Sequence, residues 1–127
     1  MNHFFILISI FSINLIYSNE YLWPSDNLDA ITATFGEPRT SRFHAGIDVR
    51  TYGQINEKLY AIDSGYISRI NLSPYKYGKA IYLTLNDGNI VLYSHINSFP
   101  KKIENFIDSL KFRFNKNYFD YNLKNNE

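Results

Sequence analysis

Residues 79–96, KAIYLTLNDGNIVLYSHI, decide the fold class of this chain. Two runs rich in Ile, Val, Leu and Tyr flank Asn86-Asp87-Gly88, and β-prone runs separated by a short turn with Asp-Gly are typical of a β-hairpin. His95 falls at the end of the second predicted strand, where alternation places it on the same face as Tyr93 and Val91. By itself, a histidine in this position is typical of a half-buried side chain with one hydrogen bond.

Two further strands are predicted upstream of this hairpin. Residues 59–62 and 66–70 are rich in Leu, Ile and Tyr, and Asp63-Ser64-Gly65 between them predicts a tight turn. A short strand is predicted over residues 30–34, whereas residues 49–59 predict a surface loop. The middle of the chain is therefore a meander of short strands. We expect a mainly β fold with an antiparallel sheet or a β-sandwich-like arrangement.

Residues 100–114 change the period of the pattern. Apolar side chains recur at helical spacing, with a proline at the start and charges of both signs on the other faces. This predicts one inserted amphipathic helix that packs against the sheet, because a membrane-binding helix typically carries a basic polar face. Residues 118–123 then predict the start of a further strand. The apolar helix positions are Ile103, Phe106, Ile107, Leu110 and Phe114.

The composition limits the function classes. A chain of 127 residues is typical of one domain. The formal net charge is +1, with 13 basic and 12 acidic residues and no basic run, so nothing indicates a nucleic-acid partner. Cysteine is absent, which excludes disulfide bonds and thiolate ligands and leaves His, Asp and Glu as metal ligands.

Residues 4–17 form a mostly apolar run, and Ser18 follows it. The run is shorter than the about 20 residues that a membrane-spanning helix needs, and its length fits the core of a signal peptide. We expect residues 1–18 to be a signal peptide, so that the mature chain has no stable membrane span and residues 19–34 form an N-terminal arm. An uncleaved anchor is one alternative, and a buried strand of a cytosolic protein is another.

His44 and Asp48, in the stretch FHAGIDV of residues 43–49, are candidate metal ligands. On a straight strand the two side chains share a face but lie roughly 13 Å apart, which is too far for one ion. Sharing a metal requires the backbone to bend at Ala45-Gly46, and glycine permits such a bend. From the spacing alone, a surface histidine and a turn-capping aspartate remain the simpler interpretation.

Four blocks of sequence resemble, in order and spacing, the lysostaphin/LytM-type zinc metalloendopeptidases over roughly residues 35–98. The resemblance implies an enzyme that hydrolyses peptide cross-links of peptidoglycan and is exported to the periplasm, the cell envelope or the outside of the cell. It implies Zn²⁺ as the cofactor, His44 and Asp48 as two of its ligands, and His95 as a catalytic residue that orients water or stabilises the oxyanion. The blocks are Phe35 to Asp48, Tyr60 to Ile67, Tyr77 to Ile81, and Tyr93 to Ile96.

The chain departs from the family pattern in three respects. Ile96 stands where leucine is usual, and Lys79 stands where a small polar residue is usual. The family also carries a downstream His-x-His whose second histidine is the third zinc ligand, and no such element follows His95. Because a catalytic zinc needs three protein ligands plus water, we expect residues 35–127 to be a partial metallopeptidase domain, truncated at its C-terminus.

Two alternatives belong to other function classes. The first is a catalytically inactive relative that acts as a cell-wall binding module or activates a partner hydrolase. The second is a small β interaction domain with incidental histidines. The presence of both His44 and Asp48 argues against an inactive relative, because such relatives tend to lose zinc ligands.

Overall fold

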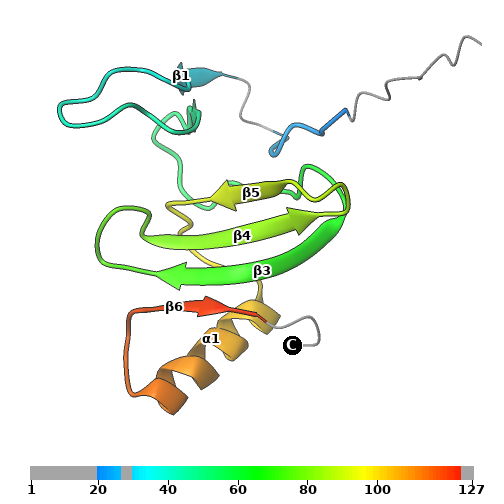
Figure 1. The fold of residues 1–127 in the computed structure, drawn as a ribbon, viewed down its shortest axis with the longest axis vertical. Helices are drawn as coiled ribbons and strands as arrows, with labels where there is room; N and C mark the ends of the chain where they lie inside the picture. Colours follow the sequence, from blue (N-terminus) through cyan, green and yellow to red (C-terminus); the bar gives the residue numbers. More distant parts are fainter. Residues whose placement is uncertain (1–19, 27–29, 124–127) are drawn as a thin grey trace, which may run out of the picture.

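The computed structural model describes residues 20–26 and 30–123, which form two antiparallel sheets and one helix (Figure 1). The chain is thus mainly β with one helix, as the sequence predicts. The predicted signal peptide, residues 1–18, lies outside the described residues. Within the described part, no helix is long and apolar enough to span a membrane. The elements are β1 (Ile31–Ala33), β2 (Asp48–Val49), β3 (Gly65–Leu72), β4 (Lys79–Leu85), β5 (Ile90–Tyr93), α1 (Lys101–Phe114) and β6 (Phe119–Asn122).

The larger sheet has the strand order β5-β4-β3-β6. β4 and β5 are the predicted hairpin, in which Ile81 pairs with Tyr93. In the turn, Gly88 has a φ of 89°, a left-handed conformation that glycine adopts without strain. Asp87 Oδ1 accepts a hydrogen bond from the backbone N–H of Asn89 at 2.9 Å. Local turn chemistry therefore fixes this hairpin.

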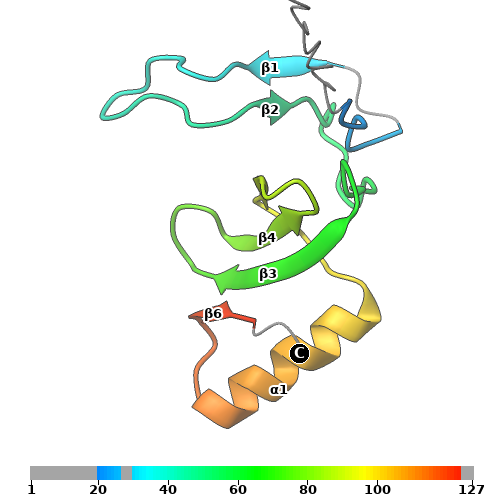
Figure 2. The same cartoon turned by 45° about the vertical axis from the view of Figure 1, so that its right-hand side comes forward.

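The hydrophobic core lies between the larger sheet and helix α1, which runs beside β6 (Figures 1 and 2). Ile107 of α1, Ile70 and Leu72 of β3, and Phe99 before the helix form its buried cluster. Ile67 also packs against this cluster, although it lies three positions before Ile70, because a β-bulge after Ile67 shifts the register of β3. The predicted helix is confirmed, and its apolar face closes the core.

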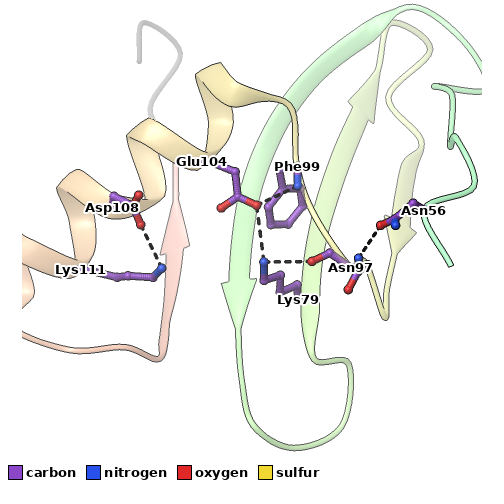
Figure 3. Close-up of polar contacts among 7 residues, drawn as sticks. All are labelled: Asn56, Lys79, Asn97, Phe99, Glu104, Asp108 and Lys111. Atoms are coloured by element: carbon purple, nitrogen blue, oxygen red, sulfur yellow. Dashed lines mark hydrogen bonds and ion pairs between the residues drawn. The ribbon is translucent and has the colours of Figure 1, made fainter.

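Glu104, in the first turn of α1, ties the helix to the sheet (Figure 3). Its Oε1 accepts a hydrogen bond from the Phe99 N–H at 2.9 Å and lies 3.5 Å from Lys79 Nζ of β4. Lys79 also donates to the Asn97 carbonyl oxygen at 3.0 Å. A carboxylate near the N-terminus of a helix is favourable because of the helix dipole. Lys79 of β4 thus forms an ion pair with Glu104 of the helix.

Strand β6 confirms the predicted strand at residues 118–123. The chain reaches it through Asn115, whose left-handed conformation ends α1. β6 pairs antiparallel with β3 and forms one edge of the sheet, whereas β5 forms the other. Across this pairing, Arg69 Nε donates to Asp120 Oδ1 at 2.6 Å, and Nη2 of the same guanidinium contacts Oδ2. The guanidinium also lies 4.6 Å above the centroid of the Tyr82 ring.

The two-stranded sheet of β1 and β2 lies apart from the larger sheet, beyond β5 and away from α1 (Figures 1 and 2). No Cα atom of β1 or β2 comes within 8 Å of a Cα atom of the larger sheet. The long connection between the two strands continues their pairing through a bridge between Pro38 and Phe43. We call residues 31–49 the ribbon. β1 confirms the short strand that the sequence predicts over residues 30–34.

The predicted strand over residues 59–62 is wrong, because these residues take no strand conformation. The Tyr60 N–H donates to the Pro24 carbonyl oxygen at 2.8 Å, and the Ile62 carbonyl oxygen accepts from the Leu22 N–H at 2.9 Å. The backbone of this segment therefore bonds to the N-terminal arm instead of forming a hairpin with β3. The sequence pattern alone does not reveal this competition between the arm and the sheet.

Candidate metal site

His44 is fixed in the ribbon by its backbone and by its ring. Its N–H donates to the Glu37 carbonyl oxygen at 2.9 Å, and its carbonyl oxygen accepts from the Gly36 N–H at 2.7 Å. Gly36 has a φ of 79°, which favours glycine at this turn of the chain. Ring atom Nδ1 lies 3.0 Å from the Thr34 carbonyl oxygen. These contacts set the orientation of the half-buried imidazole.

The structure brings His44 and Asp48 together. Nε2 of His44 lies 3.2 Å from Oδ1 of Asp48, far less than the separation on a straight strand. The chain bends at Gly46, and β2 begins only at Asp48. Asp48 is held in place in turn, because its carbonyl oxygen accepts a hydrogen bond from Thr32 Oγ1 of β1 at 3.1 Å. The predicted bend at Ala45-Gly46 is thus present.

The hydrogen bond of His44 to Thr34 determines which atom of its ring faces Asp48 without a hydrogen when the ring is neutral. A carbonyl oxygen only accepts, so His44 Nδ1 carries the hydrogen that bonds to Thr34. In the neutral ring, Nε2 then presents a lone pair to the Asp48 carboxylate, which also only accepts. A contact of 3.2 Å between these two atoms is compatible with a hydrogen that they share or with a metal ion that both of them bind.

The pair fits two positions of a zinc site. Zn–N and Zn–O distances near 2.1 Å at a tetrahedral angle place the two ligand atoms about 3.3–3.5 Å apart, close to the 3.2 Å between Nε2 and Oδ1. A ligating histidine usually donates its other ring N–H to a carbonyl or carboxylate, and His44 does so to Thr34. Within residues 20–26 and 30–123, however, no three His, Asp or Glu side chains lie close enough to hold one ion.

Arg39 is a further member of the site, and the sequence pattern predicts no role for it. Its Nη2 donates to Asp48 Oδ2 at 2.9 Å and lies 3.9 Å from Glu37 Oε2. The bridge between Pro38 and Phe43 sets the register of the ribbon and allows this contact between residues nine apart in sequence. The only sequence signal for it is a basic residue inside the first motif block.

His95 does not lie where the alternation of the predicted strand places it. β5 ends at Tyr93, and His95 has a φ of 57°, a left-handed conformation that is uncommon outside glycine. The change of backbone conformation breaks the alternation, so His95 does not share the face of Tyr93 by strand geometry. The residue is exposed, which contradicts the half-buried histidine that its position in the sequence favours.

Two other motif blocks contact the block that carries His95, one at His95 itself and one at Tyr93. The His95 N–H donates to the Tyr77 carbonyl oxygen at 2.9 Å, and a Cβ atom on Gly78 would lie 3.8 Å from His95 Nδ1. The Tyr93 hydroxyl accepts a hydrogen bond from the Ile62 N–H at 3.1 Å, and burial raises the pKa of Tyr93 above its usual value. The tyrosine of the Tyr-x-His block thus holds the preceding segment against the sheet.

The first block, which carries His44 and Asp48, lies on the separate ribbon. The structure therefore brings together the two predicted metal ligands, and it does not join His95 to them in a metal-binding cluster of the described residues. This arrangement leaves two distinct local environments, a His–Asp–Arg cluster on the ribbon and an exposed histidine after β5.

Comparison with known proteins gave no match to any family model, curated protein or solved structure. The resemblance to the lysostaphin/LytM-type enzymes therefore rests on the motif blocks alone.

Proposed function

We propose that this chain is part of an exported zinc metalloendopeptidase that hydrolyses peptide cross-links in peptidoglycan. The observation that carries the proposal is the 3.2 Å separation between His44 Nε2 and Asp48 Oδ1, with the other ring nitrogen of His44 bonded to a backbone carbonyl. A histidine and a carboxylate arranged in this way offer one nitrogen and one oxygen to a single cation. The order of the four motif blocks supports the same family.

Each residue has a separate task in this proposal. Zinc, when bound, supplies a Lewis acid that polarises the scissile carbonyl and lowers the pKa of water. His44 holds the ion through Nε2, and its bond to Thr34 keeps that lone pair available. Asp48 contributes Oδ1. The resemblance gives His95 the task of orienting the attacking water or donating to the developing oxyanion; its side chain is exposed, and among the described residues it forms no metal-binding group with His44 and Asp48.

The exposure of the site suits a polymeric substrate. The side chain of Asp48 is 49 % exposed and that of His44 is 19 % exposed, on a ribbon that stands apart from the larger sheet. A peptide within a cross-linked wall can approach such an edge, whereas it could not enter a closed cavity. The apolar leader of residues 4–17 supports export to the compartment where peptidoglycan lies.

A second candidate function is a metal-independent relative that binds cell-wall material or activates a partner hydrolase. One observation favours it: in the described part of the chain, no third His, Asp or Glu joins His44 and Asp48. In that case His44 pairs with Asp48 without a metal, and wall binding does not depend on zinc.

The test compares cleavage and binding on purified, cross-linked muropeptides. We expect this chain alone to show negligible turnover, because a two-ligand site does not fix the ion. The product of the whole reading frame, if a His-x-His follows codon 127, should cleave the cross-link in a zinc-dependent manner. His44→Ala and Asp48→Ala should each abolish zinc binding and cleavage.

Two outcomes decide against the proposal. A zinc-loaded product with the downstream His-x-His that cleaves no muropeptide would rule out the peptidase. Binding of peptidoglycan by this chain that is unchanged by chelator and by His44→Ala would support the metal-independent module instead.

A further inference from the structure

An open pocket lies where the β3–β4 connection meets the C-terminal end of α1, away from the candidate metal site. Its volume is about 270 Å³, which suits a small ligand or one group of a larger ligand. Five of the six residues that line it carry a side chain that donates hydrogen bonds, and none of the six is acidic. We call it the lysine pocket. Its lining residues are Leu72, Ser73, Lys79, Lys111, Asn117 and Tyr118.

Two lysines from different elements meet at the lysine pocket. Lys79 begins β4 and Lys111 belongs to the last turn of α1, and their side chains extend toward each other in Figure 3. Lys79 Nζ donates to the Asn97 carbonyl oxygen at 3.0 Å and lies 3.5 Å from Glu104 Oε1, whereas Lys111 Nζ lies 3.0 Å from Asp108 Oδ1. An ammonium group has three donors, so each lysine keeps at least one for a ligand.

The neutral donors of the lysine pocket are available as well. The Ser73 hydroxyl accepts a hydrogen bond from the Tyr75 N–H at 3.1 Å, and its own hydrogen remains available to a ligand. The side chains of Asn117 and Tyr118 form no hydrogen bond with another described residue. Donors from the sheet and from the connection that follows α1 therefore converge on one small space.

We propose that the lysine pocket binds a phosphate group, either of the free ion or of a phosphate ester. A phosphate group presents tetrahedral oxygens, which suit donors that converge from several segments, and lysine binds phosphate as a point charge. A carboxylate is planar and is matched better by the fork of an arginine, and no arginine lines this pocket. The proposal does not depend on the metal site.

Two features of the structure oppose an anion at this place. The first is the negative end of the dipole of α1, which is reduced because the N–H groups of Asn115 and Lys116 bond to carbonyl oxygens of the last turn. The second is the pairing of the lysines with Glu104 and Asp108. Neither carboxylate lines the pocket, and the Asp108 side chain is 68 % exposed, so its contact with Lys111 is screened by solvent.

The experiment titrates the isotope-labelled full chain with inorganic phosphate at neutral pH and constant ionic strength, and NMR shifts of the Ser73 and Tyr118 amides give the Kd. Lys111→Gln should raise the Kd about fivefold or more, because the ligand loses a charged donor. Lys102→Gln is the matched control: it removes the same charge from an exposed position of the same helix outside the pocket and should change the Kd less than about twofold.

Two further variants separate charge from hydrogen bonding. Tyr118→Phe removes one hydroxyl donor without changing the charge and should raise the Kd about threefold. Asp108→Asn removes the carboxylate that competes for Lys111 and should lower the Kd about threefold. Acetate, the control for the class of anion, should bind the parent at least about fivefold more weakly than phosphate.

Glycerol 3-phosphate identifies the source of the group. Binding as tight as that of the free ion assigns the pocket to phosphate esters, whereas exclusion assigns it to the free ion. Equal Kd values in Lys111→Gln and Lys102→Gln overturn the proposal, as does acetate binding as tight as that of phosphate or the absence of shifts at Ser73 and Tyr118 in the parent. An unchanged Kd in both Tyr118→Phe and Asp108→Asn also overturns it, whether or not Lys111→Gln folds.

Discussion

The larger sheet with its helix and the ribbon are held together by different interactions. Among the described residues, the ribbon contributes only Ala33 to the buried hydrophobic side chains, whereas eight others belong to the larger sheet, α1 and the segment before it. The ribbon is stabilised by backbone hydrogen bonds and by the exposed contacts of Arg39, His44 and Asp48. An isolated two-stranded ribbon is marginally stable in water. The fold and the candidate site are therefore expected to respond to different substitutions.

The largest expected effect is on the core. Ile107 of α1 is 1 % exposed and belongs to the buried cluster, so Ile107→Ala removes apolar packing and leaves a cavity. We expect a loss of about 2–5 kcal/mol in the free energy of unfolding, measured by urea denaturation. Phe112→Ala, on the same helix but 92 % exposed, is the control and should change stability by less than about 0.5 kcal/mol. Equal losses of unfolding free energy in the two variants would mean that Ile107 is not part of the hydrophobic core.

The second prediction compares local stability. The amides of Gly36 and His44 in the ribbon should exchange with deuterium at least about tenfold faster than the amides of the paired residues in β3 and β4. The reason is that opening the ribbon exposes little buried surface. Hydrogen exchange followed by NMR measures both regions in one sample. Equal protection would mean that the ribbon and the sheet open as one unit.

The smallest expected effect concerns the edge strand β6 and depends on pH. Arg69 beside Asp120 lowers the pKa of that carboxyl below its usual value, mainly through their hydrogen bond. A lowered pKa in the folded state means that the contribution is present above the usual pKa of about 3.8 and is lost as the pH falls below it. Because both side chains are more than one third exposed, we expect no more than about 1 kcal/mol.

The comparison that tests this effect uses the parent chain and Asp120→Asn. The parent should be the more stable of the two near neutral pH, and the difference should disappear as the pH falls through the lowered pKa of Asp120. The double variant Arg69→Gln/Asp120→Asn also loses the contact of the guanidinium with the Tyr82 ring, so it should be less stable than Asp120→Asn by an amount that does not change with pH. A difference that persists at acid pH would mean that the ion pair is not its cause.

The sequence predicts the elements whose signals are local. The β4–β5 hairpin follows from the Asn86-Asp87-Gly88 turn, and α1 follows from its helical period, because both depend on neighbours in the chain. The strand predicted at residues 59–62 is wrong, because the N-terminal arm takes its backbone hydrogen bonds. The pairing of β6 with β3 depends on how the helix crosses the sheet, and no local pattern encodes it.

The same distinction applies to the candidate site. The motif identifies His44 and Asp48, and the glycine at position 46 allows the predicted bend. The contact of Arg39 with Asp48 depends on the register of the ribbon, and the left-handed conformation of His95 depends on its bond to Tyr77. Both require knowledge of pairings between distant segments, which the spacing of residue types does not contain.

Calorimetric titration of Zn²⁺ into the parent chain and the variants His44→Ala, Asp48→Ala and His95→Ala tests the central claim most directly. We predict that the parent binds one ion weakly and that binding is lost in His44→Ala and Asp48→Ala, because these two side chains supply the ligand atoms. His95→Ala should keep the parental affinity, because His95 forms no metal-binding group with them among the described residues. The urea stability of all three variants should stay close to that of the parent, since His44 and Asp48 lie on the ribbon, apart from the core, and the His95 side chain is exposed. Loss of zinc binding in His95→Ala in step with His44→Ala, or the absence of any binding by the parent, would contradict the account.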